Sequence, residues 1–578
     1  MSIKVADQIV EMLVNNGIKR IYGVTGDSLN QINDAVRRSG KIKWIHVRHE
    51  EAGAYAAAAE AELDGLACCA GSCGPGHVHL INGLYDAHRS GVPVIALAAT
   101  INTPDFGVDY FQSTNTIKLF DDCSCYNQIA TTAKQAPRML QSAIQHAIHH
   151  KGVAVFGIPG DVLGLPMEES PASMHNYKTK IIMRPADVEI GRLAELLNQN
   201  NKVSIFCGIG AKEAHDKIIE LAALLKAPIG YSFRGKMGMQ YDNPYEVGMT
   251  GLLGLPSAYQ SMHESDVVLL LGTDFPYTAF MPSKNKIVQI DEKPEILGRR
   301  AKLEMGLCGK IGDTISALLP LIKEKSDDSF LKTQLRLYDH VKQQIQTYVN
   351  DFGSEDKISP EFVASTINEL ANEDAIFTVD TGMCCVWGAR YIHATGKRIM
   401  LGSFNHGSMA NAMPMAIGAA LSYPNRQIIA LCGDGGLSML LGDLATIKQY
   451  NLPIKLVVFN NRALGMVKLE MLVEGFPDNE TDMVNPDFAM VADAMGFKGI
   501  TVHQPSEVKG ALTEAFQIGG PVLVNIMTNP ESLAMPPKIE WEQVKGYTLS
   551  ISKLMLGGKM DEVLDIVESN YKHLKEIL

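Results

Sequence analysis

The sequence predicts an α/β protein built from three doubly wound parallel-sheet domains, followed by a C-terminal helical tail. Short apolar runs recur along the chain, and each leads into a glycine-rich or acidic turn and then a segment with helical spacing. A chain of 578 residues is also too long for one hydrophobic core, so it should divide into about three domains.

The domain boundaries are expected where the pattern changes. We expect domains over residues 1–180, 181–345 and 346–530, and a tail over 531–578. The loop at 351–354 is the expected linker between the second and third domains. The first and third domains share size and element order, as an ancient duplication would leave them.

Composition narrows the class of protein. The formal net charge of −12 argues against nucleic acid as the main partner. The ten cysteines are scattered and partly inside apolar runs, so we expect buried thiols in a reducing compartment. Cys123 and Cys125 resemble half of a metal site, but no second cluster completes it. The acidic, amphipathic N-terminus is no signal peptide, and no window is apolar enough to span a membrane, so the expected location is the cytoplasm.

The most informative stretch runs from Leu431 to Glu470. One apolar strand leads into Gly433-Asp434-Gly435-Gly436, and a second, Ile454 to Phe459, leads into Asn460-Asn461. Carboxyl ends of parallel strands meet at one edge of a sheet, so Asp434 and Asn461 should lie side by side. With the Ala463 carbonyl and diphosphate oxygens, they would complete the octahedron that Mg²⁺ requires. The glycines would let the backbone approach the phosphates.

The spacing of these two turns resembles the thiamine diphosphate (ThDP) signature. Twenty-four residues separate Gly435 from Asn460. Either half alone is more often an ordinary turn or an unrelated asparagine pair. The two halves together, each at a strand end, predict a site for ThDP and magnesium.

Glu50 is the candidate partner of this site in the first domain. It follows a predicted strand and precedes an alanine-rich helix, where a buried carboxylate needs a partner. In the functional interpretation, Glu50 bonds the N1′ nitrogen of the ThDP pyrimidine and favours its 4′-imino tautomer. The alternative is a helix N-terminal acid favoured by the dipole, which is the better interpretation of Glu50 taken alone. The turn Gly74-Pro75-Gly76 by itself predicts no more than a turn.

The second domain carries weaker signals for a dinucleotide. A strand at 203–207 meets Gly208-Ile209-Gly210, a Rossmann-like turn without the full G-x-G-x-x-G pattern. Two further strands end at Gly272-Thr273-Asp274 and at Asp291, and an acid in that place can bond a ribose hydroxyl. The glycine-rich loop 248–254 permits close approach to a ligand. The alternative is an α/β domain that packs and binds nothing.

The tail has helical spacing of apolar residues opposite a mixed charged face. Such a helix usually docks on its own domain or on a neighbouring subunit. A membrane-surface role is the alternative.

The whole chain resembles the ThDP- and flavin-dependent pyruvate oxidase family, most closely its bacterial quinone-dependent, acetate-forming pyruvate dehydrogenase branch. The resemblance is carried by five segments: 22–30 (YGVTGDSLN), 48–51 (RHEE), 70–76 (AGSCGPG), 272–277 (GTDFPY) and 402–414 (GSFNHGSMANAMP). It implies that the three domains bind the ThDP pyrimidine, FAD and the ThDP diphosphate, in that order.

The resemblance also implies residue roles. Glu50 would activate the pyrimidine, and Met409 would wedge ThDP into a bent conformation. The other catalytic positions are Phe111, Gln112, Met466 and Glu470, of which Phe111 and Gln112 would line the pyruvate pocket. The implied ThDP contacts are Glu50, Gly74, His406, Gly407, Ser408, Met409, Gly433, Asp434, Gly435, Gly436, Asn461, Ala463, Leu464, Gly465 and Met466, with Asp434, Asn461 and Ala463 on magnesium. The implied FAD contacts are Gly208, Gly210, Arg234, Gly251, Leu252, Leu253, Gly254, Thr273, Asp274, Phe275, Pro276, Tyr277 and Asp291.

The implied reaction is the oxidative decarboxylation of pyruvate to acetate and CO₂ through an enamine formed on ThDP, with electrons passing through FAD to a quinone. The family further implies a homotetramer, with each ThDP site between the first domain of one subunit and the third domain of another, and a tail that contacts membrane lipid peripherally. Two alternatives are a phosphate-dependent pyruvate oxidase using O₂ and an acetolactate synthase with non-redox FAD. One departure is Met466, where quinone-linked relatives carry an aromatic residue.

Overall fold

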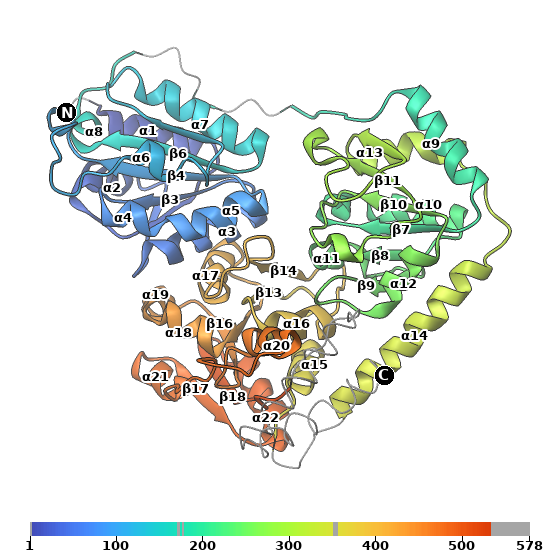
Figure 1. The fold of residues 1–578 in the computed structure, drawn as a ribbon. Helices are drawn as coiled ribbons and strands as arrows, with labels where there is room; N and C mark the ends of the chain where they lie inside the picture. The colour runs from blue at the N-terminus through green and yellow to red at the C-terminus, as the bar shows by residue number, and fades with distance from the viewer. Residues whose placement is uncertain (1–2, 170–173, 176–178, 351–356, 533–578) are drawn as a thin grey trace.

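The computed structural model describes residues 3–169, 174–175, 179–350 and 357–532, and contains three six-stranded parallel sheets flanked by helices. This confirms the predicted α/β class. Figure 1 shows the first sheet at the upper left, the second at the upper right and the third below them. The predicted linker loop 351–354 and the tail from residue 533 lie outside the described residues. The boundaries at 180, 345 and 530 stay predictions.

The first sheet has the order β2-β1-β3-β4-β6-β5. Its strands are β1 (Arg20–Gly23), β2 (Lys43–His46), β3 (Ala67–Gly71), β4 (Val94–Thr100), β5 (Tyr126–Ile129) and β6 (Val153–Pro159). Its helices are α1 (Val5–Asn15), α2 (Asn30–Ser39), α3 (Glu50–Asp64), α4 (Pro75–His79), α5 (Ile81–Ser90), α6 (Thr116–Leu119), α7 (Ala136–His150) and α8 (Gly160–Gly164). Helices α4 and α5 are separated at Leu80, whose N–H bonds the His77 carbonyl at 3.3 Å in a tighter turn.

The third sheet, β14-β13-β15-β16-β18-β17, repeats the first strand for strand, which supports the duplication. Its strands are β13 (Ile376–Val379), β14 (Ile399–Gly402), β15 (Ile428–Gly433), β16 (Ile454–Asn460), β17 (Lys498–Val502) and β18 (Val522–Met527). Its helices are α15 (Pro360–Leu370), α16 (Met383–Tyr391), α17 (Ala412–Ser422), α18 (Asp434–Met439), α19 (Leu444–Gln449), α20 (Gly465–Glu474), α21 (Phe488–Ala494) and α22 (Pro505–Gln517). A 3₁₀ turn, Leu441–Asp443, separates α18 from α19.

The central sheet has a different order, β12-β11-β10-β7-β8-β9, which is the Rossmann order 6-5-4-1-2-3. Its strands are β7 (Val203–Cys207), β8 (Ile229–Tyr231), β9 (Glu246–Met249), β10 (Val267–Leu271), β11 (Lys286–Asp291) and β12 (Met305–Cys308). Its helices are α9 (Asp187–Gln199), α10 (His215–Leu225), α11 (Lys236–Met239), α12 (Pro256–Glu264) and α13 (Ile311–Leu318). The long α14 (Ser329–Asn350) runs from this domain down to the third (Figure 1).

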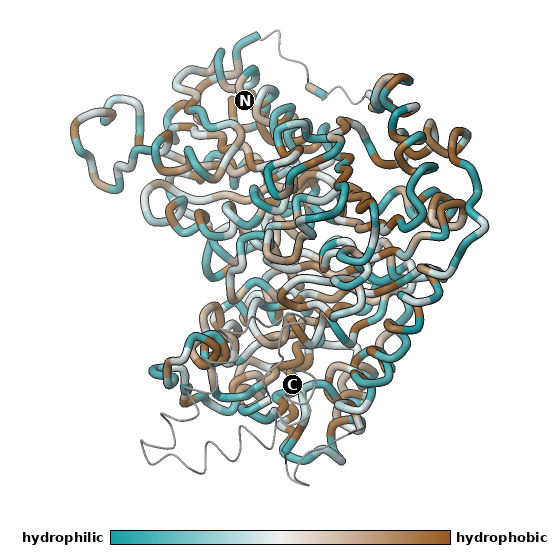
Figure 2. The backbone as a smooth tube through the Cα atoms, turned by 45° about the vertical axis from the view of Figure 1, so that its right-hand side comes forward, coloured by the Kyte–Doolittle hydropathy of each residue, from teal (hydrophilic) through white to brown (hydrophobic). Residues whose placement is uncertain are grey.

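The strands form the interior of each domain. β4, β6, β7, β10 and β16 are buried along their whole length, as apolar strands of parallel sheets covered on both faces should be. Figure 2 shows hydrophobic segments gathered inside the lobes, with hydrophilic segments mostly along the outside. No helix among the described residues combines the length and hydrophobicity needed to cross a membrane.

The first and third domains share one hydrophobic core through α3 and α17. Alanine-rich α3 contributes Ala52 to Ala61, and α17 contributes Ala412 to Ala420. At Gly418 a Cβ would lie 2.1 Å from the Ala56 carbonyl oxygen, so only glycine permits this close approach. The packing joins the two domains that carry the two halves of the predicted ThDP site.

Polar contacts join the central domain to both neighbours. The buried Lys236 Nζ donates to the carbonyls of Ala389 and Ile392 at 2.5 and 2.6 Å, at the C-terminus of α16, and burial lowers the pKa of Lys236 to about 7. Arg390 donates to the Leu253 carbonyl. Arg234 donates to the Ser90 carbonyl of the first domain at 2.9 Å.

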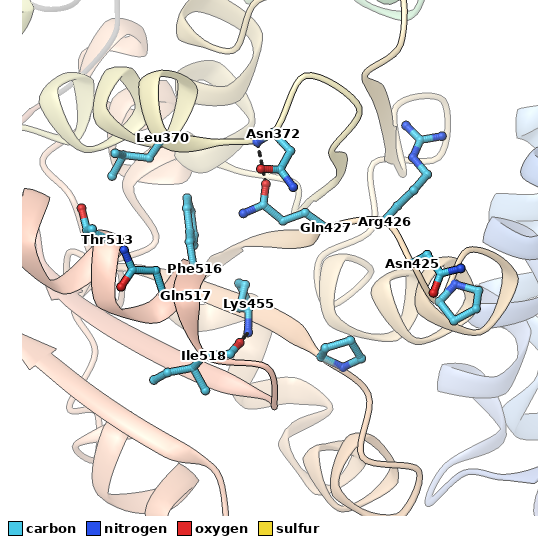
Figure 3. A pocket seen from close by; sticks show the side chains of 12 residues that line it. Leu370, Asn372, Asn425, Arg426, Gln427, Lys455, Thr513, Phe516, Gln517 and Ile518 are labelled. Carbon is cyan, nitrogen blue, oxygen red and sulfur yellow. Dashed lines mark hydrogen bonds between the residues drawn. The ribbon is translucent and has the colours of Figure 1, made fainter.

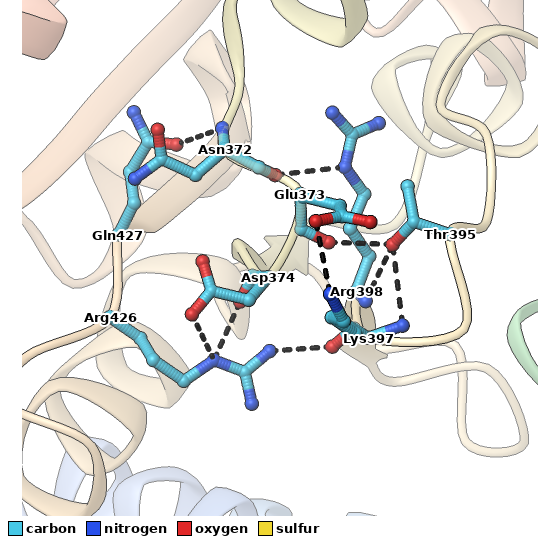
Figure 4. Close-up of polar contacts among 8 residues, drawn as sticks. All are labelled: Asn372, Glu373, Asp374, Thr395, Lys397, Arg398, Arg426 and Gln427. Carbon is cyan, nitrogen blue, oxygen red and sulfur yellow. Dashed lines mark hydrogen bonds and ion pairs between the residues drawn. The ribbon is translucent and has the colours of Figure 1, made fainter.

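Arg398 closes the C-terminus of α15, and Figure 4 shows its side chain bonded to the carbonyl of Asn372, just after that helix. Its side chain makes five hydrogen bonds, to the carbonyls of Asn368, Ala371, Asn372 and His393 and to the Asn368 side chain. The residue is only 8% exposed. Because helix C-terminal carbonyls lack intrahelical partners, a buried guanidinium with all its donors used satisfies several at once.

We therefore expect Arg398→Ala to destabilise the protein by about 2–4 kcal/mol, because several carbonyls lose their donor. Urea unfolding of the full-length protein measures the change. Lys397→Ala is the matched control, since its exposed ion pair with Glu373 contributes about 0.2–1 kcal/mol. Equal unfolding midpoints for the two variants would contradict the capping role.

Candidate active site

The candidate residues of the third domain lie at the carboxyl edge of its sheet. β15 and β16 pair in parallel, with Gly433 opposite Phe459, so Asp434 and Asn461 follow at the same edge. Chain order reverses between β13 and β15, the topological switch point at which open α/β sheets bind ligands. The predicted adjacency of the two turns is present.

Asp434 is 3% exposed and is held by hydrogen bonds. Its Oδ1 accepts the Gly435 N–H at 3.0 Å, and its Oδ2 accepts the Arg462 N–H at 2.8 Å. Asn461 Oδ1 accepts the Ala463 N–H at 3.1 Å. Burial raises the pKa of Asp434, and the N–H groups of Gly435 and Arg462 oppose that rise.

These groups fit a hard cation. Among the described residues there is no cluster of three or more His, Cys, Asp or Glu able to hold a metal. A cation at this edge would instead use the Asp434 carboxylate, the Asn461 amide oxygen and the Ala463 carbonyl. Oxygen-only donors that leave positions for phosphate oxygens suit Mg²⁺. Leu464 and Gly465 follow at the start of α20, where a Cβ on Gly465 would lie 2.8 Å from Asn461 Nδ2.

Met409 lies against the glycine turn, and its role on ThDP stays a prediction. A Cβ on Gly435 would meet the Met409 Cε at 3.0 Å. A Cβ on Gly436 would lie 2.0 Å from Asp380 Oδ2. Asp380 was not predicted from sequence, yet its fully buried carboxylate at the end of β13 accepts the Ala412 N–H, and burial raises its pKa to about 7. Its signal was the Asp-Thr-Gly that follows a strand.

The loop after β14 connects this turn to the first domain. His406 Nε2 lies 2.9 Å from Asn82 Oδ1, and Asn82 Nδ2 donates to Ser408 Oγ at 3.0 Å. Gly407 has φ +76° with open space around it, and Ala410 has φ +67°. A non-glycine residue in this region is strained, and such residues gather at functional sites.

Glu50 is the first residue of α3 and is 5% exposed, so the dipole interpretation also applies to it. Its Oε2 lies 2.9 Å from His79 Nδ1, and the His79 ring stacks on His49 with centroids 4.4 Å apart. Sequence reasoning missed His79, which comes from α4 directly after the Gly-Pro-Gly turn. A Cβ on Gly76 would be 3.2 Å from Glu50 Oε1. The turn therefore packs against the carboxylate.

Gly74 and Gln112 are also brought together. A Cβ on Gly74 would lie 2.9 Å from Gln112 Cβ, and Cys73 Sγ donates to the Gln112 carbonyl at 3.1 Å. Gln112 has φ +61°, another strained non-glycine position. Its neighbour Phe111 is 77% exposed. Among the described residues, no hydrogen bond joins the Glu50 group to the Asp434 loop.

The predicted FAD residues meet at the switch point of the central sheet, between β7 and β10. Gly208 and Gly210 pack on Gly272, since a Cβ at either position would lie within 3 Å of that residue. Their packing accounts for these two glycines without a ligand. Beside Gly251, the buried Thr250 hydroxyl has no hydrogen-bond partner, which fits a ligand group at this loop.

The remaining FAD candidates line the same edge. A Cβ on Gly251 would lie 2.9 Å from the Phe275 ring and 3.6 Å from the Tyr277 ring, so both rings pack against this glycine. Asp274 forms ion pairs with Arg299 and Arg300. Burial raises the pKa of Asp291. Candidates that the same loops carry are Leu252, Leu253, Gly254, Thr273 and Pro276.

Arg234 lines a cavity of about 260 Å³ between the central and third domains, together with Ile209 and Phe404. A larger pocket, about 430 Å³, opens at the opposite edge of the third sheet, where Lys455 donates to backbone carbonyls (Figure 3). Parallel sheets bind ligands at their carboxyl ends, so the larger pocket has no part in the candidate site.

Comparison with known families matches part of each of the three sheet domains. Residues 3–119 match the thiamine pyrophosphate enzyme N-terminal TPP binding domain, residues 190–318 the central domain, and residues 380–526 the C-terminal TPP binding domain. Thiamine pyrophosphate is another name for ThDP. The chain belongs to the thiamine pyrophosphate enzyme family.

Individual relatives of this family match over most of their length. A putative thiamine pyrophosphate-containing protein of Bacillus subtilis is 34% identical over 100% of both chains. Pyruvate oxidase of Lactiplantibacillus plantarum is 32% identical over 89% of this chain and 87% of its own. A probable acetolactate synthase large subunit of Methanocaldococcus jannaschii is 30% identical over 92% and 93%.

Within this family architecture, α20 carries the last two candidates. Met466 is half-buried and packs against the core of the third domain. Glu470 lies one turn further and is exposed. A flexible, apolar methionine thus occupies the first turn of α20, directly after the loop that carries Asn461 and Ala463.

Gly436→Ala should disrupt the glycine turn, residues 433–436, because the new Cβ would overlap Asp380 Oδ2. We expect destabilisation of about 1–3 kcal/mol, a lower melting temperature and weaker ThDP binding. Gly442→Ala is the control, since nothing lies within 4 Å of a Cβ there. ThDP titration and thermal melting of both variants provide the measurement, and the prediction is wrong when both bind ThDP like the wild type.

Proposed function

We propose that this enzyme converts pyruvate and water to acetate and CO₂, passing two electrons through FAD to a quinone. The observation that carries the proposal is that three features occur together in one chain. The first domain holds Glu50 beside His79, and the third domain holds Asp434 and Asn461 at one sheet edge. The central sheet has the Rossmann order and an unpartnered Thr250 hydroxyl. The 32% identity to a pyruvate oxidase supports pyruvate as the substrate.

The cofactors would supply the reactive chemistry: ThDP a nucleophilic carbon and an electron sink, and FAD a two-electron acceptor. Glu50 would hold a proton at the N1′ nitrogen of the pyrimidine, while His79 keeps its carboxylate in place. Asp434, Asn461 and the Ala463 carbonyl would hold Mg²⁺ against the diphosphate. Phe111 and Gln112 would line the pyruvate pocket and exclude water.

The rival activities share this site. A phosphate-dependent pyruvate oxidase would give acetyl phosphate and peroxide, and an acetolactate synthase would not use FAD for redox. The 30% identity to a probable acetolactate synthase supports the second of these alternatives. Met466, in place of an aromatic residue, is the feature that departs from the quinone-linked pattern.

Anaerobic pyruvate should bleach the bound flavin, because electrons left by decarboxylation have no other acceptor. Absorbance at the flavin maximum records the reduction, and a ubiquinone analogue should restore the colour faster than O₂. The product should be acetate. An unbleached flavin during turnover would favour the synthase, and acetyl phosphate would favour the phosphate-dependent oxidase.

We also propose a homotetramer in which the first domain of one subunit faces the third domain of another. Exposed apolar side chains on both support this: Val108, Tyr110 and Phe111 on the first domain, and Phe476 and Val484 on the third. Such side chains clustered around a site indicate burial by a partner. Peripheral lipid contact through the tail stays a prediction, since residues 533–578 lie outside the described residues.

Mixing two inactive variants tests the shared site. Glu50→Gln and Asp434→Ala should each lose about 10²-fold or more in turnover, since each removes a group acting on ThDP. Co-expressed subunits should recover up to about a quarter of wild-type activity, because random pairing makes about half of the pairs mixed and a mixed pair has one intact site of two. Absence of recovery in mixed oligomers, isolated by two affinity tags, would contradict a site shared between subunits.

A further inference from the structure

A segment outside the ThDP signature lies along residues 461–465, which we call the cation loop. We call residues 478–487 the strap. The Leu464 N–H donates to the Thr481 carbonyl, and the Met483 N–H donates to the Arg462 carbonyl, both at 2.8 Å. Ala463 and Asp482 form an antiparallel bridge between them. The strap therefore runs antiparallel to the loop that carries the Ala463 carbonyl.

Asn485 of the strap reaches the cation carboxylate itself. Its Nδ2 donates to Asp434 Oδ2 at 2.7 Å and to Asn460 Oδ1 at 3.1 Å. The Arg462 N–H also donates to Asp434 Oδ2, at 2.8 Å. A carboxylate oxygen has two lone pairs, so Oδ2 is fully used. Oδ1 accepts only the Gly435 N–H among the described residues, and keeps a lone pair for a cation.

The Asn485 amide is itself held from behind. Asn460 Nδ2 donates to Asn525 Oδ1 at 3.0 Å, which turns the Asn460 oxygen toward Asn485. Asn460 and Asn525 are 2% and 1% exposed, on the adjacent strands β16 and β18. Three amides thus connect the core of the sheet to Asp434. In the Asn460-Asn461 pair, the first asparagine supports the Asn485 amide, and the second is the candidate cation ligand.

We propose that Asn485 is a positioning residue of the cation site: it holds Asp434 Oδ2 so that Oδ1 faces the divalent cation. Because the same side chain anchors the strap, cation and diphosphate binding also order the strap. This inference rests on the proposed Mg²⁺–ThDP site. Metal ligands are commonly oriented by such outer partners, whose loss costs about 10–100-fold in metal affinity.

The test compares three variants of the full-length protein. Asn485→Ala removes the amide, and Asn485→Gln keeps it but displaces it by one carbon. Asn479→Ala is the matched control, since Asn479 is an exposed asparagine of the same strap. The measured quantity is the Mg²⁺ concentration that gives half-maximal ThDP binding, followed by protein fluorescence. We expect an increase of about 10-fold or more for Asn485→Ala, a smaller one for Asn485→Gln, and none for Asn479→Ala.

Proteolysis provides a readout that is independent of catalysis. A glutamate-specific protease should cut after the exposed Glu480, which has φ +55°. Mg²⁺ with ThDP should protect that bond in the wild type and in Asn479→Ala, and much less in Asn485→Ala. A purely structural role would lower the melting temperature and leave both the Mg²⁺ midpoint and the protection unchanged.

The outcomes separate the inference from the function beneath it. Wild-type Mg²⁺ dependence in Asn485→Ala, or in Asn485→Gln where the alanine variant does not fold, would overturn the inference. Asp434→Ala is the reference for the site itself. Should Asp434→Ala bind ThDP with an unchanged Mg²⁺ midpoint, the proposed cation site fails. If Asp434→Ala loses ThDP binding while Asn485→Ala binds like the wild type, the cation site stands and only the role of Asn485 is overturned.

Discussion

The parallel pairing of β15 with β16 is the constraint on which the candidate site depends. Its register sets Gly433 opposite Phe459, so the chain leaves both strands at one edge. Asp434 and Asn461 are then neighbours whatever the intervening helices do. The Arg462 N–H bond to Asp434 and the strap refine that placement, but neither could create it without the register.

Duplication accounts for the shared topology of the first and third domains, which carry the two halves of the candidate site. The first and third sheets have the same strand order, and each presents a glycine turn at its switch point: Gly71 to Gly76 in one and Gly433 to Gly436 in the other. The two have diverged in chemistry. One turn packs against the Glu50 carboxylate, and the other carries Asp434, the candidate cation ligand. Small residues on α3 and α17 let the two domains share one core.

The central domain has the Rossmann order and is tied to both neighbours through side chains that donate to backbone carbonyls. Lys236 of the central domain donates to a carbonyl of the third domain, and Arg234 donates to a carbonyl of the first domain. Arg390 of the third domain donates to a carbonyl of the central domain. These contacts fix the edge of the central sheet relative to the third domain. A flavin bound at that edge would therefore have a defined position relative to the diphosphate turn.

Sequence by itself determined the α/β class, the strand at 203–207 and the adjacency of Asp434 and Asn461, because apolar periodicity and strand-end turns are local. It could not assign the partners of Asp380, His79 or Asn485, because those partners are distant in the chain or in a separate loop. Nor could it distinguish the packing glycines Gly208 and Gly210 from ligand-binding ones. Only the tertiary structure decided these, because hydrogen-bond partners and space for a Cβ depend on which segments meet.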